Sequence, residues 1–376
     1  MGFWQIVHID IAPDIVDAVL EAAQGETTPR ATAAVRVIRA ATQALERGTH
    51  LITMTAEDLA RLRAIKDKFF GSEWCCFEII EDHLPELQAL LNTLRVHVQL
   101  GFADQGRLGE RYPHSHNVFI NPTEHARFNC AVRSSLVAED LTDCDFFCCI
   151  ARSYLYWQGL EVGLEVKAVN GGGSTIAQAV RHELEDAEHA VLALADSDKR
   201  YPEDEPHATA RSLLNPALLK YDLYGQHIVS AVTEAENLIP FKYLTERWHK
   251  HNRIVLGCLA DLLHGLRWTP DFLDLKKGLS FEDLLDEQVA SYWCSQWQCN
   301  LQQLKLCLGC DTGSILEGVS SASSRNKIIS TLLEKYTKEL SATAKSELSE
   351  AQLEEWREIG QAVLDWCCCY AERQPL

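Results

Sequence analysis

Three short apolar runs organise the middle of the chain. They cover residues 136–139, 164–169 and 191–198; the first and last end in acidic residues, and the second is followed by a glycine-rich turn. Short apolar runs that are bounded by turn residues and separated by helical spacing indicate parallel strands joined by helices. Ligands of such folds bind where the carboxyl ends of the strands meet. We therefore expect the acids and the glycine turn to share one edge of a sheet.

The acids at these strand ends predict a metal site. In an extended segment Asp196 and Asp198 point to the same side, because strand side chains alternate. Two carboxylates so close repel each other unless one takes up a proton or a cation lies between them. Together with Glu139 they form an all-oxygen ligand set of the kind that Mg²⁺ or Mn²⁺ prefers. The pattern favours metal-assisted phosphoryl chemistry; the alternative is a Rossmann-like domain with solvated acids at its strand ends.

Two segments near these acids offer groups for a substrate phosphate. Gly172, Gly173 and Ser174 precede a predicted helix, and bare backbone N–H groups at a helix N-terminus bind anions. The structural alternative is a tight turn that needs glycine dihedral angles. Lys199 and Arg200 follow the last acid and are placed to meet phosphates. Their alternative role is that of solvated loop residues.

The order of these motifs resembles the Toprim domain of topoisomerases, primases and OLD-family nucleases. That domain has a Glu after its first strand and an Asp-x-Asp after a later one, as Glu139 and residues 196–198 do. The OLD-type version adds an Asp four residues after the Glu, which Asp143 matches, and a Gly-Gly-Ser-like turn, which 171–174 matches. Family members commonly have Gly after the first Glu. Asp140 stands there in this chain, and its side chain would either crowd the metal or add a ligand.

Two later segments extend the resemblance, which covers roughly residues 131–245. Residues 234–240 are similar to a Glu-Ile-Glu-Asn segment of Toprim effector nucleases in phage-defence systems. The resemblance implies that Glu236 completes a second metal position, and an extended segment would put Glu234 on the same face. Lys276 lies in a segment that resembles an apolar-x-x-Lys motif of similar nucleases, in which the lysine stabilises charge during phosphoryl transfer.

The predicted architecture is α/β, a Toprim (Rossmann-like) parallel-sheet core over 131–245 between two mainly helical regions. The N-terminal region, 1–130, has no predicted role. It combines a strand over 4–11 with helical spacing over 15–23, 31–47, 59–70 and 84–100 and a polar loop over 104–117. The C-terminal region, 246–376, shows long helical periodicity, including a helix that starts with a capping pattern at Ser349.

Histidines of the N-terminal region could extend the chemistry, but plainer interpretations are favoured. His8 and Asp10 could be taken for a catalytic pair; an exposed strand end is the preferred interpretation. His114 and His116 could approach the metal site from their loop; surface histidines are the preferred interpretation.

Composition limits the setting in which the protein works. The 376 residues are 47% hydrophobic and 24% charged, as in ordinary globular proteins. No apolar run reaches 18 residues and no secretory signal is present, so we expect a cytoplasmic protein without a membrane segment. The net charge is −19, which disfavours unaided long-range attraction to nucleic acid and favours a partner subunit.

The fourteen cysteines are expected to be free thiols. Many are adjacent in sequence and lie among apolar residues, which is typical of buried thiols in a reducing compartment. Four of them could form a thiolate zinc site: Cys294, Cys299, Cys307 and Cys310. The first two fall in one predicted helix, which spreads the ligands, so buried thiols are preferred.

The resemblance implies a metal-dependent endonuclease that cleaves nucleic-acid phosphodiester bonds with Mg²⁺ or Mn²⁺. It also implies the effector of an anti-phage defence system, as in OLD-like and PARIS-type proteins. The chain contains no Gly-x-x-x-x-Gly-Lys-Ser/Thr motif, so the ATPase partner is expected to be a separate subunit. A homo-oligomer is compatible with the sequence. The alternatives are a toxin that cleaves transfer RNA and a non-catalytic acidic scaffold that binds a partner.

Overall fold

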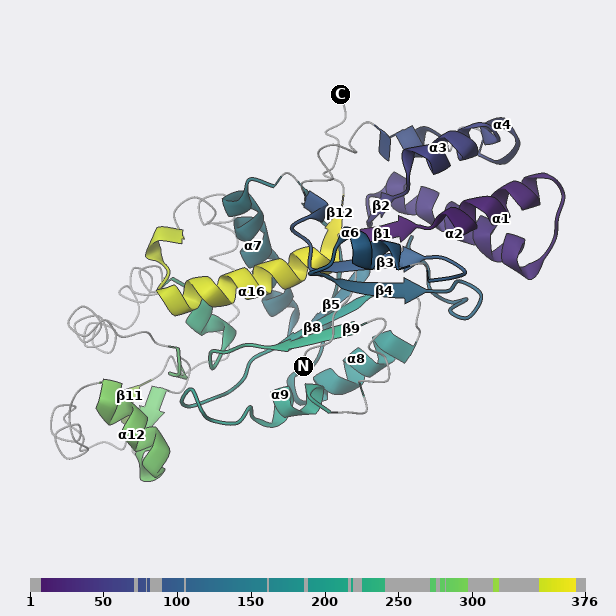
Figure 1. The fold of residues 1–376 in the computed structure, drawn as a ribbon. Helices are drawn as coiled ribbons and strands as arrows, with labels where there is room; N and C mark the ends of the chain where they lie inside the picture. The colour runs from purple at the N-terminus through teal and green to yellow at the C-terminus, as the bar shows by residue number, and fades with distance from the viewer. Residues whose placement is uncertain are drawn as a thin grey trace.

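The structure is a computed structural model, and it describes the following residues: 8–70, 74–78, 80–81, 90–104, 106–160, 162–185, 189–215, 218, 225–240, 271–274, 278–280, 282–296, 314–317 and 345–369. Within them the fold is α/β and contains two four-stranded sheets, each built from parallel strands. This architecture is compatible with a Rossmann-like core. The two sheets lie side by side along the length of the molecule (Figure 1).

The first sheet occupies the N-terminal region, where a mainly helical region was expected. Its strand order is β2-β1-β3-β4, and its strands are β1 His8–Ile11, β2 Leu51–Thr53, β3 Val96–Leu100 and β4 His116–Ile120. Its helices are α1 Pro13–Ala23, α2 Pro29–Arg47, α3 Ala56–Arg63, α4 Lys66–Phe69 and α6 Arg107–Arg111. The predicted helices over 15–23, 31–47 and 59–70 correspond to four of them. The expectation of a mainly helical region is incomplete: helices hold more of the described residues than strands do, but β2, β3 and β4 were not predicted.

Polar side chains buried inside this sheet explain part of that error. His8 and Asp10 are buried, and so are His97 and Gln99 on the neighbouring strand. The Nδ1 atoms of His8 and His97 lie 2.7 Å apart, and burial lowers the pKa of His97 to about 4, although the Leu94 carbonyl works against this. His8 and Asp10 therefore belong to the interior rather than to an exposed strand end.

The second sheet matches the three runs from which the core was predicted. Its order is β7-β5-β8-β9, and its strands are β5 Ser134–Ala138, β7 Val166–Asn170, β8 Val191–Ala195 and β9 Gly225–Val229. Helices α7 Leu141–Gln158, α8 Ile176–Glu185 and α9 Ala208–Leu213 connect or follow these strands. The run over 164–169 divides, because β6 Gly163–Leu164 pairs antiparallel with β12 Cys368–Cys369 at the end of the chain.

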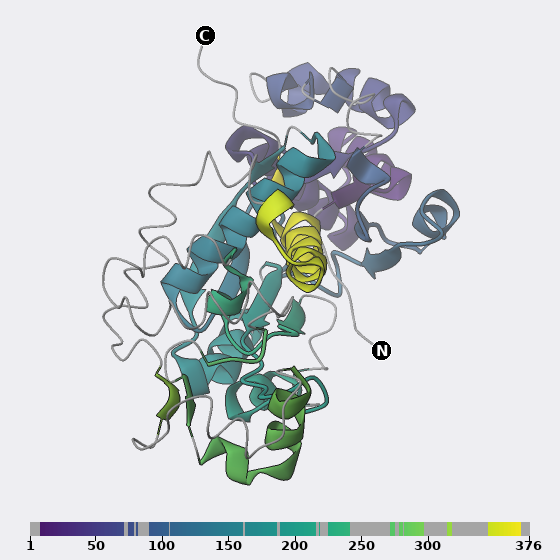
Figure 2. The same ribbon diagram turned by 90° about the vertical axis from the view of Figure 1, so that its left-hand side faces the viewer.

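Helix α16, Glu350–Cys367, packs against α7 and crosses the middle of the molecule (Figures 1 and 2). Ser349 caps it with Gln352 in a capping box, as predicted. Trp356 is fully buried; its ring stacks on Trp157 with centroids 5.6 Å apart, and its indole N–H donates to Leu238 O. This helix packs mainly on α7 and also reaches β8 of the second sheet.

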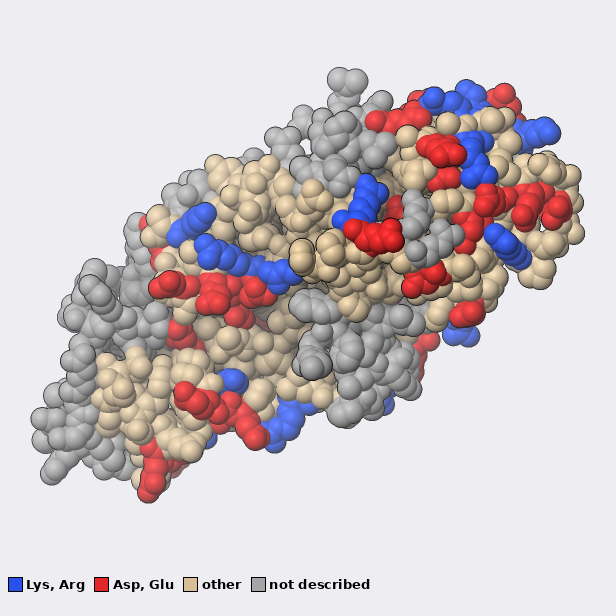
Figure 3. All heavy atoms as spheres, viewed as in Figure 1, with Lys and Arg blue, Asp and Glu red and all other residues tan. Residues whose placement is uncertain are grey.

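The remaining described elements lie at the end of the molecule away from α1 and α2. They are β10 Gly278–Ser280, β11 Ser314–Glu317 and α12 Glu287–Gln296 (Figure 1). Lys and Arg side chains are interspersed with acidic ones on the face seen in Figure 3. Among the described residues no helix combines the length and the hydropathy that crossing a membrane requires.

Candidate active site at the carboxyl edge of the second sheet

Glu139 and Asp196 follow two neighbouring strands at the same edge of the second sheet. Strands β5 and β8 are paired with Val137 opposite Ala193, so the chain leaves both strands on one side. Asn170, which ends β7, is paired with Ala138, so the glycine turn follows at this edge too. The expectation that the acids and the glycine turn share one edge is therefore confirmed.

The Asp196–Asp198 segment is bent, which differs from the extended form that was assumed. Strand β8 ends before Asp196, and Asp198 has a left-handed backbone with φ 53°. The Ser197 hydroxyl donates to Val232 O at 2.5 Å, and Asp198 N donates to Thr233 O at 2.9 Å. Asp196 is buried and Asp198 is half-buried. Alternation along a strand therefore does not fix the relative direction of the two carboxylates.

The residues after Glu139 form a helix cap. One Asp140 carboxylate oxygen accepts hydrogen bonds from Thr142 N at 2.7 Å and from Asp143 N at 3.0 Å. Asp143 returns the contact, because its carboxylate accepts from Asp140 N at 3.2 Å. This capping box starts α7. The acid that departs from the Toprim pattern thus has a structural function here, and Asp143 is buried beside it.

The glycine turn is held against the end of β5. Gly171 N donates to Ala138 O at 2.7 Å, while Gly172 N and Gly173 N approach Glu139 O at 3.1 and 3.4 Å. Gly172 and Gly173 have φ values of 67° and 59°, which L side chains rarely adopt. The turn needs glycine, as the structural alternative expected. Its amides already donate to Ala138 O, to Glu139 O and, from Gly172 N, to the Asn170 side-chain oxygen at 2.8 Å, so a phosphate would have to compete with these contacts.

The chain does not pass directly from the glycines into α8. A short 3₁₀ turn, Gly173–Thr175, precedes the helix, and the Thr175 hydroxyl donates back to Gly171 O at 2.7 Å. Ser174 is exposed, and no side-chain cap at Ser174 or Thr175 is formed in this described turn. Of the predicted phosphate-contacting residues in the turn, Ser174 is the one whose side chain faces solvent.

Lys199 and Arg200 lie in the loop that follows Asp198, and both have partners. The Lys199 ammonium donates to Pro202 O at 3.3 Å. The Arg200 guanidinium contacts Asp204 at 3.3 Å and Asp286 at 2.9 Å. Burial alone would raise the pKa of Asp204, but the hydrogen bonds from Arg200 hold that pKa below its ordinary value. Arg200 therefore ties the loop to the residue before α12.

Glu234 and Glu236 lie in a 3₁₀ helix, Ala235–Leu238, rather than in an extended segment. Glu234 is its N-cap, and Glu234 N donates to the Asn237 side chain at 2.8 Å. Both glutamates are buried. Period-two alternation therefore does not place them on one face. The Gln352 amide donates to Asn237 O at 2.6 Å, which docks this turn on α16.

Some backbone groups hold the site in place, and the sequence gives no indication of which ones they are. Val232 and Thr233 hold the Asp196–Asp198 bend through their carbonyl oxygens, and Thr233 N in turn donates to Asp271 O at 2.9 Å. Carbonyl groups exist at every position, so residue types cannot reveal which of them brace a site.

Lys276, Cys299, Cys307 and Cys310 lie outside the described residues. Cys294 is a half-buried free thiol. Most of the other described cysteines are buried free thiols, as expected, and burial raises the pKa of Cys130 and Cys144 to about 12.

The donor set suits a hard cation in its chemistry, because Glu139, Asp196 and Asp198 all offer carboxylate oxygens near one sheet edge. The side chains are farther apart than those of a formed metal site. Among the described residues no three His, Cys, Asp or Glu side chains are grouped closely enough to hold a metal ion. Binding of one ion by all three acids would require their side chains to come together.

Comparison with family models, curated proteins and solved structures gave no match. The Toprim resemblance consequently rests on the motif residues and on their order along the chain.

Proposed function

We propose that this protein is a Mg²⁺- or Mn²⁺-dependent endonuclease that cleaves phosphodiester bonds in nucleic acid. The observation that carries the proposal is the position of Glu139 and Asp196 after neighbouring parallel strands, with Asp198 two residues further on. Carboxylates at this edge of a parallel sheet lie where ligands of such folds bind. The proposed class is a Toprim nuclease, by resemblance of the motifs.

In the proposed site Glu139, Asp196 and Asp198 hold the ion, and Asp143 and Glu236 complete the ligand cluster. When bound, the ion supplies an activated water and neutralises charge on the phosphate. The chain's own contribution is positioning. The glycine turn fixes the Glu139 backbone, and the contacts of residues 197 and 198 with 232 and 233 fix the bend that carries the two aspartates.

The proposed substrate contacts come from the loop after the aspartates and from the glycine turn. Lys199 and Ser174 can reach a phosphate without breaking an ion pair, because Lys199 contacts a carbonyl and Ser174 is exposed. Arg200 has a different role in the proposal, since its guanidinium contacts Asp204 and Asp286 and orders the loop.

The proposed setting is bacterial defence against phage, with an ATPase as a separate subunit. The net charge of −19 supports a partner that brings the nucleic acid to the site, because the chain as a whole repels phosphates. A transfer-RNA-cleaving toxin would use the same acids.

Cleavage of nucleic acid tests the proposal. Wild type, Asp196→Asn and Glu205→Gln are incubated with plasmid DNA, single-stranded DNA and total transfer RNA, with Mn²⁺, with Mg²⁺ or with EDTA. Glu205 is a matched control, because it is an exposed carboxylate of the same loop. We expect metal-dependent cleavage by wild type and Glu205→Gln, and a loss of at least about 100-fold in Asp196→Asn.

A non-catalytic acidic scaffold is the second candidate, and the looseness of the acid group favours it. A scaffold would cleave no substrate with or without the ATPase subunit, and calorimetry would detect no Mn²⁺ binding. That pair of results would reject the nuclease proposal.

A further inference from the structure

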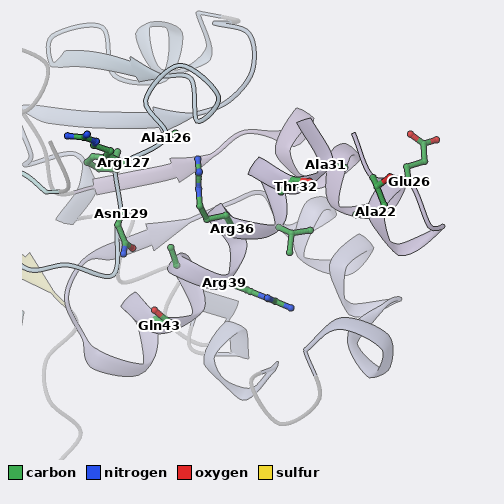
Figure 4. A pocket seen from close by; sticks show the side chains of 14 residues that line it. Ala22, Glu26, Ala31, Thr32, Arg36, Arg39, Gln43, Ala126, Arg127 and Asn129 are labelled. Atoms are coloured by element: carbon green, nitrogen blue, oxygen red, sulfur yellow. The ribbon is translucent and has the colours of Figure 1, made fainter. Parts of the chain in front are cut away.

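A hollow of about 580 Å³ lies between α2 and the segment 126–129 (Figure 4). It is at the α1–α2 end of the molecule, whereas Arg200 ties the loop of the candidate active site to Asp286 at the α12 end (Figures 1 and 2). Ligand pockets commonly measure about 300–1,000 Å³. The hollow is therefore large enough for part of a ligand and is separate from the acids of the second sheet.

The lining of the hollow is cationic in a chain that is strongly acidic overall. Arg36, Arg39 and Arg127 line it, and Glu26 is the only acidic residue of that lining. Helix α2 carries four arginines and one glutamate, although the whole chain has 54 acidic against 35 basic residues. This local excess of positive charge favours an anionic ligand.

Two of the three guanidinium groups are available to a ligand. Arg36 donates to Pro122 O at 2.5 Å, which joins α2 to the segment after β4. Arg39 and Arg127 are exposed, and within the described part of the chain neither has a hydrogen-bond or ion-pair partner. Arginine binds phosphate oxygens through its planar fork of donors, so both residues can contact phosphates directly.

The directions of the side chains indicate a ligand with more than one phosphate. In Figure 4 the guanidinium groups of Arg36, Arg39 and Arg127 point in three different directions rather than to a common centre. The α2 face that lines the hollow runs from Ala31 to Gln43, which is about 18 Å of helix. A single phosphate would use one guanidinium, whereas successive phosphates of a strand can use several.

We propose that this hollow, named here the arginine groove (Arg36, Arg39, Arg127 and Glu26), binds the backbone of single-stranded nucleic acid. The role of the groove rests on the proposed nuclease function, because the groove would dock the substrate strand away from the cleavage site. Binding is weak and dependent on salt, because few cations oppose a net charge of −19. Affinity in the micromolar range is expected, as for non-specific binding.

Fluorescence anisotropy with labelled 20-nucleotide DNA and RNA strands tests the groove. The full chain is used in EDTA, so that no metal-dependent cleavage occurs, over a series of salt concentrations. The test variant is Arg39→Ala/Arg127→Ala. The matched control is Arg47→Ala/Arg181→Ala, which removes two exposed arginines outside the groove. A third variant, Glu26→Gln, removes the groove's acid.

We expect the test variant to bind about tenfold more weakly or worse. Its slope of log affinity against log salt should be smaller by about 1.4, because two phosphate contacts are lost at about 0.7 each on a single strand. The control should bind within about twofold of wild type, and Glu26→Gln should bind more tightly. Circular dichroism confirms that each variant is folded.

Equal affinity of the test variant and wild type for the strands would overturn the proposal that the arginine groove binds them. So would an equal loss in the control variant, which would mean general charge attraction. Binding of AMP at these arginines without binding of the strand would also overturn it. Failure of cleavage in every assay, together with arginine-dependent binding in EDTA, would reject the nuclease proposal and leave the groove standing.

Discussion

Asp140 is the residue at which the chain departs from the Toprim pattern, and its contacts explain why an acid is kept there. Its carboxylate accepts from two backbone N–H groups at the start of α7, and Asp143 completes the capping box. The candidate site and the first turn of α7 therefore share residues. Replacement of Asp140 therefore removes its own carboxylate and also alters the position of Asp143.

Replacement of Asp140 should affect stability according to capping ability. We expect Asp140→Ala to lower the free energy of unfolding by about 1 kcal/mol, because two N–H groups lose their acceptor, and Asp140→Ser to lower it by much less. Urea denaturation measures both. If Asp140 serves only as a helix cap, Asp140→Ser should keep the metal-dependent cleavage of wild type. Loss of cleavage in that variant without loss of stability would make Asp140 a ligand instead.

At the scale of elements, the turn between β7 and α8 fixes how closely the helix approaches the strand ends. A Cβ atom at Gly171 would lie 2.6 Å from Ala138 O and 2.6 Å from Ile176 Cγ1. The backbone oxygen cannot move without shifting β5, and Glu139 follows that oxygen directly. Packing at this glycine is thus coupled to the geometry of the candidate site.

Gly171→Ala should therefore destabilise the protein by about 1–3 kcal/mol, as overpacking does in a filled interior. Gly109→Ala is the matched control, because a Cβ at Gly109 in α6 meets open space. There the change should be neutral or slightly stabilising, since alanine is the better helix residue. Thermal unfolding of the two variants compares them, and equal effects would contradict the close approach at Gly171.

Three strands of the second sheet could be predicted from their apolar runs, whereas β9 Gly225–Val229 was not predicted because Gln226 and His227 interrupt its apolar residues. Strand β8 consists of five buried apolar residues between turn signals. Strand β3 was missed although its residues alternate between apolar and polar, because the helical spacing of the preceding residues continues into it. Strand β2 is only three residues long. Polar residues buried in pairs, such as His8 and His97, have no signature in a single sequence.

The sheet edge that carries the candidate site could be predicted, but the local backbone geometry of the site residues could not. Parallel strands necessarily bring Glu139 and Asp196 to one edge, and this required no side-chain detail. The bend at Asp198 and the 3₁₀ helix at Glu236 depend on contacts with residues 232–233 and with α16, far along the chain. Such tertiary contacts override the local preference for extended structure.

At the scale of the whole molecule, α16 joins the two sheets. Arg95, just before β3, donates its backbone N–H to Asp365 at 2.9 Å, and the Gln361 amide donates to the same carboxylate oxygen at 2.8 Å. The Arg95 guanidinium pairs with Glu358 on the same helix. Burial raises the pKa of Asp365 to about 7, against the lowering effect of these hydrogen bonds.

This junction predicts a pH dependence of stability. The folded state holds the Asp365 proton more tightly than the unfolded state, whose pKa is near 3.8. Its contribution to stability is therefore present below about pH 4 and is lost as pH rises through about 7, by up to about 4 kcal/mol. We expect Asp365→Asn, whose amide oxygen can keep both contacts, to equal wild type near pH 4 and to exceed it at pH 8.

Urea denaturation of wild type and Asp365→Asn between pH 4 and 8 measures the difference. Asp145→Asn, on the exposed side of α7, is the control and should follow wild type throughout. A constant offset between Asp365→Asn and wild type across this range would show that Asp365 does not titrate there.

Mn²⁺ binding measured by titration calorimetry tests the central claim most directly, since that claim joins acids from two strands in one site. Glu139→Gln and Asp196→Asn are compared with wild type, with their double variant and with Glu205→Gln. We predict that wild type and Glu205→Gln bind Mn²⁺, that each single variant loses at least about tenfold in affinity, and that the double variant loses less than the sum of the two. Additive losses, or no binding by wild type, would contradict a shared metal site at this edge.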